Sequence, residues 1–139
     1  MNALIDTCAV IDALQKREPF WQDAAKVFHA AAVWRFKGFI TAKALAETYY
    51  IMRRALHNDQ QTRELLEKLL TLFHLLDTSA TDCRQTLASN LSDFEDALMA
   101  ETAIRSGLDL IMTRNLKDYV KAPIEVLSPI EFLTRLERV

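Results

Sequence analysis

Residues 2–17 read NALIDTCAVIDALQKR, and this stretch decides which class of fold the chain adopts. Its first part, residues 2–6, is a short and mostly apolar run that ends in Asp6, which is typical of a buried strand. Residues 9–17 follow with the pattern of a helix. A strand followed by a helix is the unit from which parallel sheets are built. The opening residues therefore predict an α/β protein.

The same alternation continues along the chain. Further strands are expected at residues 39–41, 74–79, 108–113 and 124–128, and further helices at 19–36, 43–56, 60–73, 80–90, 92–107 and from Pro129 onward. Alternating strands and helices predict a mostly parallel sheet that is covered on both faces. The two consecutive helices at 43–56 and 60–73 interrupt the alternation, which disfavours a regular flavodoxin-like order of strands.

Length and composition indicate a single domain over residues 1–139, since 139 residues suit one hydrophobic core. The net charge of -2 and the pI of about 5.9 exclude a global basic field, so any nucleic acid must bind at a local patch. The first residues contain acids and no basic segment, and no apolar run is as long as a membrane span. Cys8 and Cys83 lack the spacing of a metal site. We expect a reduced, cytoplasmic protein with no membrane contact.

Several polar residues follow the predicted strands, at the edge where open parallel sheets bind ligands. These residues are Asp6, Asp77, Asn115 and Asp118. Position alone does not separate the functional ones from the others.

The helix expected at residues 92–107, SDFEDALMAETAIRSG, is more informative. On a helical wheel Asp96 lies between small residues that face the rest of the fold, and a carboxylate buried there needs a partner. Ser92 and Glu95 have the spacing of a capping box, so we expect them to start the helix. Asp93 is explained equally well by capping or by a site.

Glu47 leaves two interpretations open. It lies in the helix expected at 43–56, where it could form a surface pair with Lys43 or Arg54 or could belong to the site. If Asp6, Glu47, Asp96 and Asp118 meet at one edge, their charges require protonation or a cation. Oxygen ligands alone select a hard cation such as Mg²⁺ or Mn²⁺, and the isolated histidines offer no alternative ligand set.

These residues also resemble those of a known family. LIDTCAVID, TAKALAETYYIMRR, DFEDALMAETAIRSG and LIMTRNLKDY follow one another along most of the chain, as the acidic motifs do in PIN-domain ribonucleases of the VapC-like toxin type. Asp6, Glu47, Asp96 and Asp118 match the acids of these motifs, and Asp93, Thr113 and Asn115 match supporting positions. One departure is Cys8, where the family commonly has a small polar residue.

The resemblance implies a three-layer α/β/α sandwich with a central sheet of about four to five strands. It implies an endoribonuclease that uses Mg²⁺ or Mn²⁺ to hydrolyse RNA and leaves a 5′-phosphate and a 3′-hydroxyl. Asp6, Asp96 and Asp118 would hold the metal, and Glu47 would hold metal or orient water. Thr113 and Asn115 would support Asp118 or a phosphate.

The resemblance also implies partners: an RNA substrate, a cognate antitoxin protein and a second copy of the chain in a homodimer. Basic residues near the acidic motifs are candidate phosphate contacts, although each alone is as easily a solvated surface charge. They are Lys43, Arg53, Arg54, Arg114 and Lys117. The aromatic residues that could supply partner surfaces are equally well explained as core. They are Phe20, Trp21, Phe28, Trp34, Phe36, Tyr49 and Tyr50.

Other classes fit less well. A phosphoacceptor domain needs an acidic pair after the first strand, and an Asp-x-Asp phosphatase needs an acid where Cys8 stands. Two alternatives remain: a non-catalytic RNA- or protein-binding module of the same fold, and an RNA-processing PIN nuclease that is not a toxin.

Overall fold

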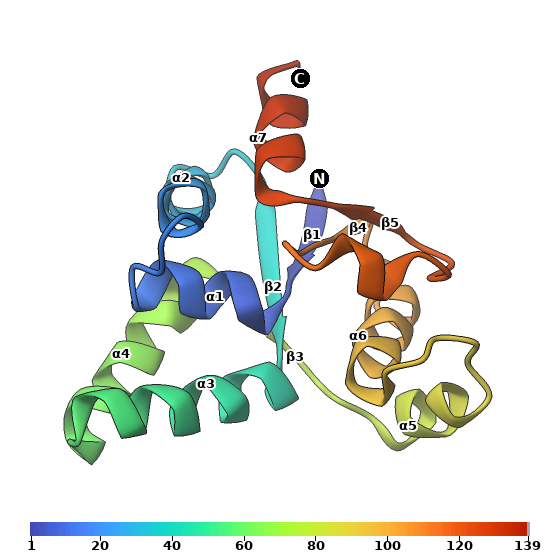
Figure 1. Ribbon diagram of the computed structural model, residues 1–139, viewed down its shortest axis with the longest axis horizontal. Coiled ribbons are helices and arrows are strands. Elements are labelled where there is room, and N and C mark those ends of the chain that lie inside the picture. The colour runs from blue at the N-terminus through green and yellow to red at the C-terminus, as the bar shows by residue number, and fades with distance from the viewer. Residues whose placement is uncertain (139) are drawn as a thin grey trace.

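The computed structural model describes residues 1–138, and its centre is one sheet of five parallel strands in the order β3-β2-β1-β4-β5 (Figure 1). The strands are β1 (Asn2–Ile5), β2 (Lys37–Thr41), β3 (His74–Leu76), β4 (Leu110–Met112) and β5 (Glu125–Leu127). All five strands lie within the predicted segments or overlap them, and the sheet is parallel throughout. The order β3-β2-β1-β4-β5 is not the flavodoxin-like order, which the two consecutive helices had already disfavoured.

Helices connect the strands. They are α1 (Thr7–Leu14), α2 (Trp21–Ala32), α3 (Ala42–Leu56), α4 (Asp59–Leu72), α5 (Ala80–Leu87), α6 (Phe94–Arg105) and α7 (Pro129–Glu137). A short 3-10 helix, η1 (Leu116–Tyr119), follows β4 and was not expected from the sequence. The helix expected to begin at Pro19 begins instead at Trp21, because residues 18–20 form a turn. No helix within residues 1–138 combines the length and the apolar character needed to cross a membrane.

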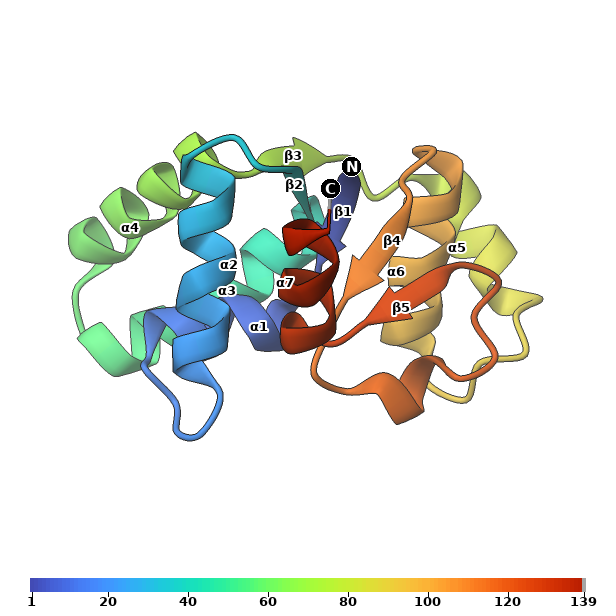
Figure 2. The same cartoon turned by 90° about the horizontal axis from the view of Figure 1, so that it is seen from above.

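The helices form a layer on each face of the sheet, as Figures 1 and 2 show. Helices α1, α2 and α7 pack together on one face of the sheet, with α3 and α4 beside them. Helix α6 covers the other face, and α5 packs against α6. Strand β1 serves both cores, because Ala3 and Ile5 enter one cluster and Leu4 enters the other. This is the three-layer α/β/α sandwich that the family resemblance implied.

The register of the sheet brings two segments of the site together. Ile5 pairs with Met112, and the amide of Asp6 donates to the carbonyl of Met112 at 3.0 Å. The next residue of each strand, Asp6 and Thr113, therefore emerges at the same edge. This is the carboxyl edge, where open parallel sheets bind their ligands.

Candidate active site at the carboxyl edge of the sheet

Asp6 is the buried centre of the candidate site, with only 8% of its surface exposed. It is the N-cap of α1, and its Oδ1 accepts a hydrogen bond from the amide of Thr7 at 2.8 Å. The hydroxyl of Thr113 donates to Oδ2 at 2.8 Å. Burial raises the pKa of Asp6, and the hydrogen bonds from Thr113 and Thr7 offset only part of that rise. A carboxylate in this setting favours a cation nearby.

Tyr119 lies beneath the site, and its role was not foreseen from the sequence. Its hydroxyl donates to Oδ2 of Asp6 at 3.4 Å. Burial and then the charges of Asp6 and Asp96 raise the pKa of Tyr119, so that the phenol stays protonated and can donate. Because Tyr119 follows Asp118 directly in η1, it anchors that acid to the site.

Asp96 occupies the first turn of α6 and is half-buried. Burial, followed by the charges of Asp93, Asp6 and Asp118, raises the pKa of Asp96 to about 6. The charges of three other acids that the sequence singled out thus act on Asp96, although burial contributes more to its raised pKa. Repulsion between neighbouring carboxylates is typical of sites that bind a cation.

The start of α6 corrects one expectation. Asp93, and not Ser92, is the N-cap, and its Oδ1 accepts from the amide of Asp96 at 3.0 Å. The predicted capping box of Ser92 and Glu95 is therefore wrong. Both Ser92 and Asp93 are good cap residues, and the backbone geometry selects the second one.

Glu95 instead faces Lys43, which also holds Glu47. The Nζ atom of Lys43 lies 2.8 Å from Oε1 of Glu47 and 3.3 Å from Oε2 of Glu95. Glu47 therefore forms the pair with Lys43 that one of its two interpretations expected, and its role in the site stays a prediction. The described hydrogen bonds of Glu47 reach this lysine and not Asp6 or Asp96.

The predicted basic residues are not gathered in one place. Arg53 and Arg54 lie in the last turn of α3, about 15 Å along the helix from Lys43. The Nε of Arg114 donates to Oδ2 of the buried Asp12 at 2.6 Å. Lys117 is exposed on η1 beside Asp118. Of this set, Lys43 contacts Glu47 and Glu95, and Lys117 directly precedes Asp118 in the chain.

Whether the site suits a metal ion depends on which side-chain atoms it offers as ligands. Within the described residues, no three His, Cys, Asp or Glu side chains converge on one point where an ion would be held. The candidate acids Asp6, Asp96 and Asp118 nevertheless offer carboxylate oxygens, and the charges of Asp6 and Asp118 raise the pKa of Asp96. This chemistry fits a hard divalent cation, and binding would require the side chains to turn toward a common point.

Cys8 stands at the position where the sequence departs from the family pattern. Its Sγ lies 3.7 Å from Oδ2 of Asp6 and 3.4 Å from the hydroxyl of Thr113. Burial, and then the charge of Asp6, raises the pKa of Cys8 to about 11, so the thiol stays neutral. It occupies the polar position as a weak donor and leaves the contacts of Asp6 intact.

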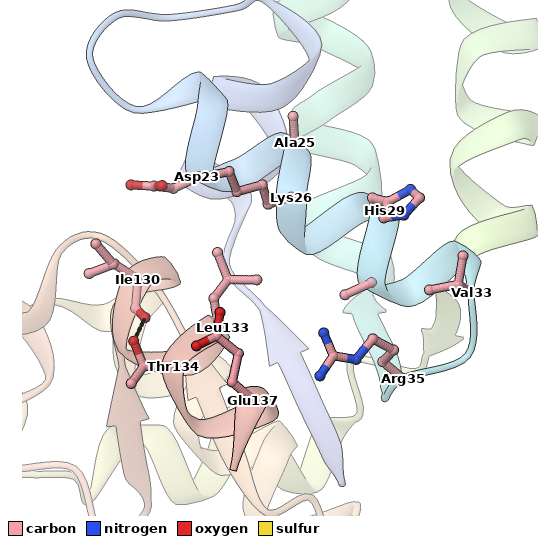
Figure 3. A pocket seen from close by; sticks show the side chains of 11 residues that line it. Asp23, Ala25, Lys26, His29, Val33, Arg35, Ile130, Leu133, Thr134 and Glu137 are labelled. Atoms are coloured by element: carbon pink, nitrogen blue, oxygen red, sulfur yellow. Dashed lines mark hydrogen bonds between the residues drawn. The ribbon is translucent and has the colours of Figure 1, made fainter. Parts of the chain in front are cut away.

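A large groove of about 560 Å³ lies elsewhere, between α2 and α7 (Figure 3). Lys26 and His29 line it from α2, and Leu133 and Glu137 line it from α7. None of the candidate acids lies in its wall. The volume of a groove therefore does not identify the site, and the candidate site is assigned from its polar side chains at the carboxyl edge of the sheet.

Comparison with known proteins gives one family and several similar structures. A family model described as "PIN domain" matches residues 2–117. A toxin-antitoxin complex from Klebsiella pneumoniae contains a chain that is 25% identical, with a TM-score of 0.69, and the match covers 91% of this chain and 97% of that one. No curated protein matches.

Two further structures share the fold at lower identity. VapBC2 from Rickettsia felis, bound to a promoter DNA fragment, is 19% identical with a TM-score of 0.65, covering 92% of this chain and 98% of that one. VapC20 from Mycobacterium tuberculosis, described as a toxin that cleaves the sarcin-ricin loop, is 15% identical with a TM-score of 0.61, covering 78% and 86%.

Proposed function

The chain belongs to the PIN domain family, and from this premise we propose that it is a metal-dependent endoribonuclease, the toxin of a toxin–antitoxin pair. The observation that carries the proposal is the group of carboxylates at the carboxyl edge of the sheet. Asp6 comes from the end of β1, Asp96 from the first turn of α6 and Asp118 from η1, and the charges of Asp6 and Asp118 raise the pKa of Asp96. The similarity to a toxin-antitoxin complex supports the biological role.

In this proposal Asp6, Asp96 and Asp118 hold Mg²⁺ or Mn²⁺, and Asp93 adds negative charge beside Asp96. A bound divalent ion of this kind lowers the pKa of water and offsets charge on a phosphate. Thr113 fixes the orientation of the Asp6 carboxylate through its 2.8 Å hydrogen bond. The amide of Asn115 donates to the same hydroxyl at 3.1 Å and so holds the turn that carries Asp118.

The remaining charged residues act on the substrate. Lys43 lies at the rim, half-buried between Glu47 and Glu95, and an RNA phosphate would compete with these acids for its amine. When Lys43 turns to phosphate, Glu47 loses its partner and becomes free to hold metal or orient water. Lys117 would contact a neighbouring phosphate, and Arg53 and Arg54 would contact only more distant ones.

The partners follow from the family and from the exposed apolar surface. Helices α3 and α4 line an apolar groove of about 390 Å³, with Leu45, Tyr49, Leu66 and Leu70 in its wall. We propose that an antitoxin segment covers this groove. Of the aromatic residues expected at partner surfaces, Trp34 and Tyr50 are exposed and suit a homodimer contact, whereas Phe36 is buried core. A cytoplasmic location and a single domain remain predictions.

The proposal is tested by cleavage of a mixed RNA pool with purified protein in Mn²⁺, Mg²⁺ or a chelator. We expect metal-dependent cleavage that Asp96→Asn abolishes and that Asp23→Asn retains, since Asp23 lines the remote groove between α2 and α7. Cleavage that persists in Asp96→Asn would assign the activity to another site or a contaminant. If no RNA is cleaved and no metal binds, a non-catalytic binding module of the same fold is the better description.

A further inference from the structure

Asp12 and Arg114 form an ion pair that the catalytic proposal does not use. Asp12 lies in the second turn of α1, and its side chain is 2% exposed. Arg114 follows Thr113 directly, and its Nε donates to Oδ2 of Asp12 at 2.6 Å. The guanidinium also lies 4.4 Å from the centre of the Phe20 ring. Two side-chain contacts therefore hold this arginine, and only part of it reaches solvent.

The pair is poorly arranged for stability alone. Oδ1 of Asp12 is buried without a hydrogen-bond partner among the described residues, so the carboxylate loses solvation on one side without compensation. A buried ion pair is often replaceable by apolar residues without loss of stability. Stability alone therefore does not explain why a charged pair occupies this buried position.

The position of Arg114 supplies that explanation. It lies between Thr113, whose hydroxyl holds Asp6, and Asn115, whose amide donates to that same hydroxyl. Helix α1 thus contacts this turn at two places along its length: Asp6 and Cys8 at its start contact Thr113, and Asp12, about one and two-thirds turns after Asp6, bonds Arg114. Attachment at two places fixes the rotation of the turn relative to the helix, whereas attachment at the start alone would leave it free to pivot.

We propose that Asp12 and Arg114 are positioning residues, which hold the Thr113–Asn115 turn so that Thr113 orients the carboxylate of Asp6. This inference rests on the proposed nuclease function and extends it. It assigns Arg114 a role inside the protein in place of the phosphate contact that its charge suggested. The inference also gives Asp12 a functional role, although Asp12 would contact neither the metal nor the RNA.

The test is the double variant Asp12→Leu/Arg114→Met, which removes both charges together and leaves no unpaired one. We expect a urea midpoint equal to or above that of the wild type. We expect kcat to fall about 10- to 100-fold with KM changed less than about threefold, and Mn²⁺ affinity, measured by electron paramagnetic resonance, to fall about tenfold. A folded double variant with wild-type kcat and Mn²⁺ affinity would overturn the inference.

The matched control is Asp82→Leu/Arg105→Met, which removes another pair formed by a buried acid and an arginine. Arg105 Nε donates to Oδ1 of Asp82 at 2.7 Å, at the end of α6 remote from Asp96. Asp82 also completes a capping box with Ser79, so this variant should lower the urea midpoint while kcat of the folded protein is unchanged. A kcat loss equal to that of the first pair would show that general loosening explains both, against the inference.

Two other results have separate meanings. In the first, the double variant has a raised KM and an unchanged kcat, and the slope of log affinity against log salt is reduced by about one. This result would make Arg114 a direct RNA contact and overturn the inference. If the wild type neither cleaves RNA nor binds Mn²⁺, the proposed function has failed. The inference is then decided by hydrogen exchange of the Asn115 amide, which must be faster in the double variant, and unchanged exchange would refute it.

Discussion

The hydroxyl of Thr113 donates a 2.8 Å hydrogen bond to Oδ2 of Asp6 and so joins the ends of β4 and β1, which are 107 positions apart in the sequence. Both residues are buried. The bond lowers the pKa of Asp6 against the larger rise that burial causes, and it points the carboxylate into the site. This single hydrogen bond thus favours the ionised form of Asp6 and also fixes the direction of its carboxylate.

Replacing Thr113 with Val should therefore reduce activity more than stability. The shape of the side chain is kept, but Asp6 loses a donor and its pKa rises further, so less of it is ionised to bind a cation. We expect kcat to fall at least about tenfold and the free energy of unfolding to fall by about 1–2 kcal/mol. The measurement is single-site RNA cleavage beside urea unfolding.

Thr62→Val is the control for that experiment. Thr62 is fully buried in α4, and its hydroxyl donates to the carbonyl of Asn58 at 2.7 Å, far from the acids. It should lose comparable stability and no activity. Equal activity losses in the two variants would contradict a specific role for Thr113.

Gly38 in β2 tests the packing beneath the site. A Cβ at this position would lie 2.5 Å from Cδ1 of Phe73, a ring that is 2% exposed and cannot move outward freely. Gly38→Ala should destabilise the protein by about 1–3 kcal/mol through overpacking, measured by urea unfolding. Gly38→Ala combined with Phe73→Leu should recover part of that loss, and a variant as stable as the wild type would contradict the close approach.

Much of the fold was predictable because its determinants are local. Apolar runs that end in Asp6 or precede Asn115 indicated strands, and the strand-helix alternation indicated a parallel sheet. Asp96 was recognised as inward-facing because helical periodicity places it among small residues. Each of these signals lies within a short stretch of the sequence, no longer than one or two helical turns.

The remaining features depend on contacts between distant segments. Arg114 meets Asp12 across 102 positions, and Tyr119 meets Asp6 across 113, so neither contact leaves a local pattern. The aromatic residue after Asp118 was visible in LKDY but had no partner to mark it as part of the site. Glu95 was misassigned because its acceptable local role, a cap, competed with an ion pair to Lys43 on another helix.

Lys43 is predicted to exchange its carboxylate partners for RNA. Burial lowers its pKa, but Glu47 and Glu95 outweigh that effect and hold the pKa above its usual value, so the amine is charged at neutral pH. Lys43→Met should raise KM several-fold and reduce the slope of log affinity against log salt by about one. Glu95→Gln should leave KM unchanged or lower it, because the amine then has one competitor fewer.

The exposed Lys68 on α4 provides the matched control for Lys43. Lys68→Met removes the same charge from the chain and should leave both KM and the salt slope unchanged. If the two methionine variants behave alike, Lys43 acts only through net charge and not through contact with a phosphate.

Asp82 should make folding sensitive to acid. Burial raises its pKa, but hydrogen bonds from Arg105, from Ser79 and from Thr102 outweigh burial and hold the pKa below its usual value. A carboxyl with a lowered folded pKa contributes stability above its unfolded pKa of 3.8, and that stability is lost as pH falls through the lower folded value. In urea unfolding at several pH values, Asp82→Asn should be less stable than the wild type at pH 7, and the difference should shrink below about pH 4. A constant difference across that range would exclude the linkage.

Asp96 should behave in the opposite way. Burial, Asp93, Asp6 and Asp118 raise its pKa from 3.8 to about 6 in the folded protein, so its ionisation opposes folding. The folded state then holds more protons than the unfolded state between these values, and stability falls as pH rises from about 4 to 6. Such a shift corresponds to about 3 kcal/mol, which solvent screening of a half-buried group reduces to about 1 kcal/mol.

Asp96→Asn should therefore stabilise the metal-free protein by about 1 kcal/mol at pH 7 and by nothing below about pH 4. Mn²⁺ should reverse the order, since it stabilises only a protein that binds it in the folded state. Urea unfolding in chelator and in excess Mn²⁺ measures both effects on the two proteins. A variant less stable than the wild type in chelator at pH 7 would mean that the Asp96 carboxylate is satisfied within the protein, and no charge would then remain there for a cation to neutralise.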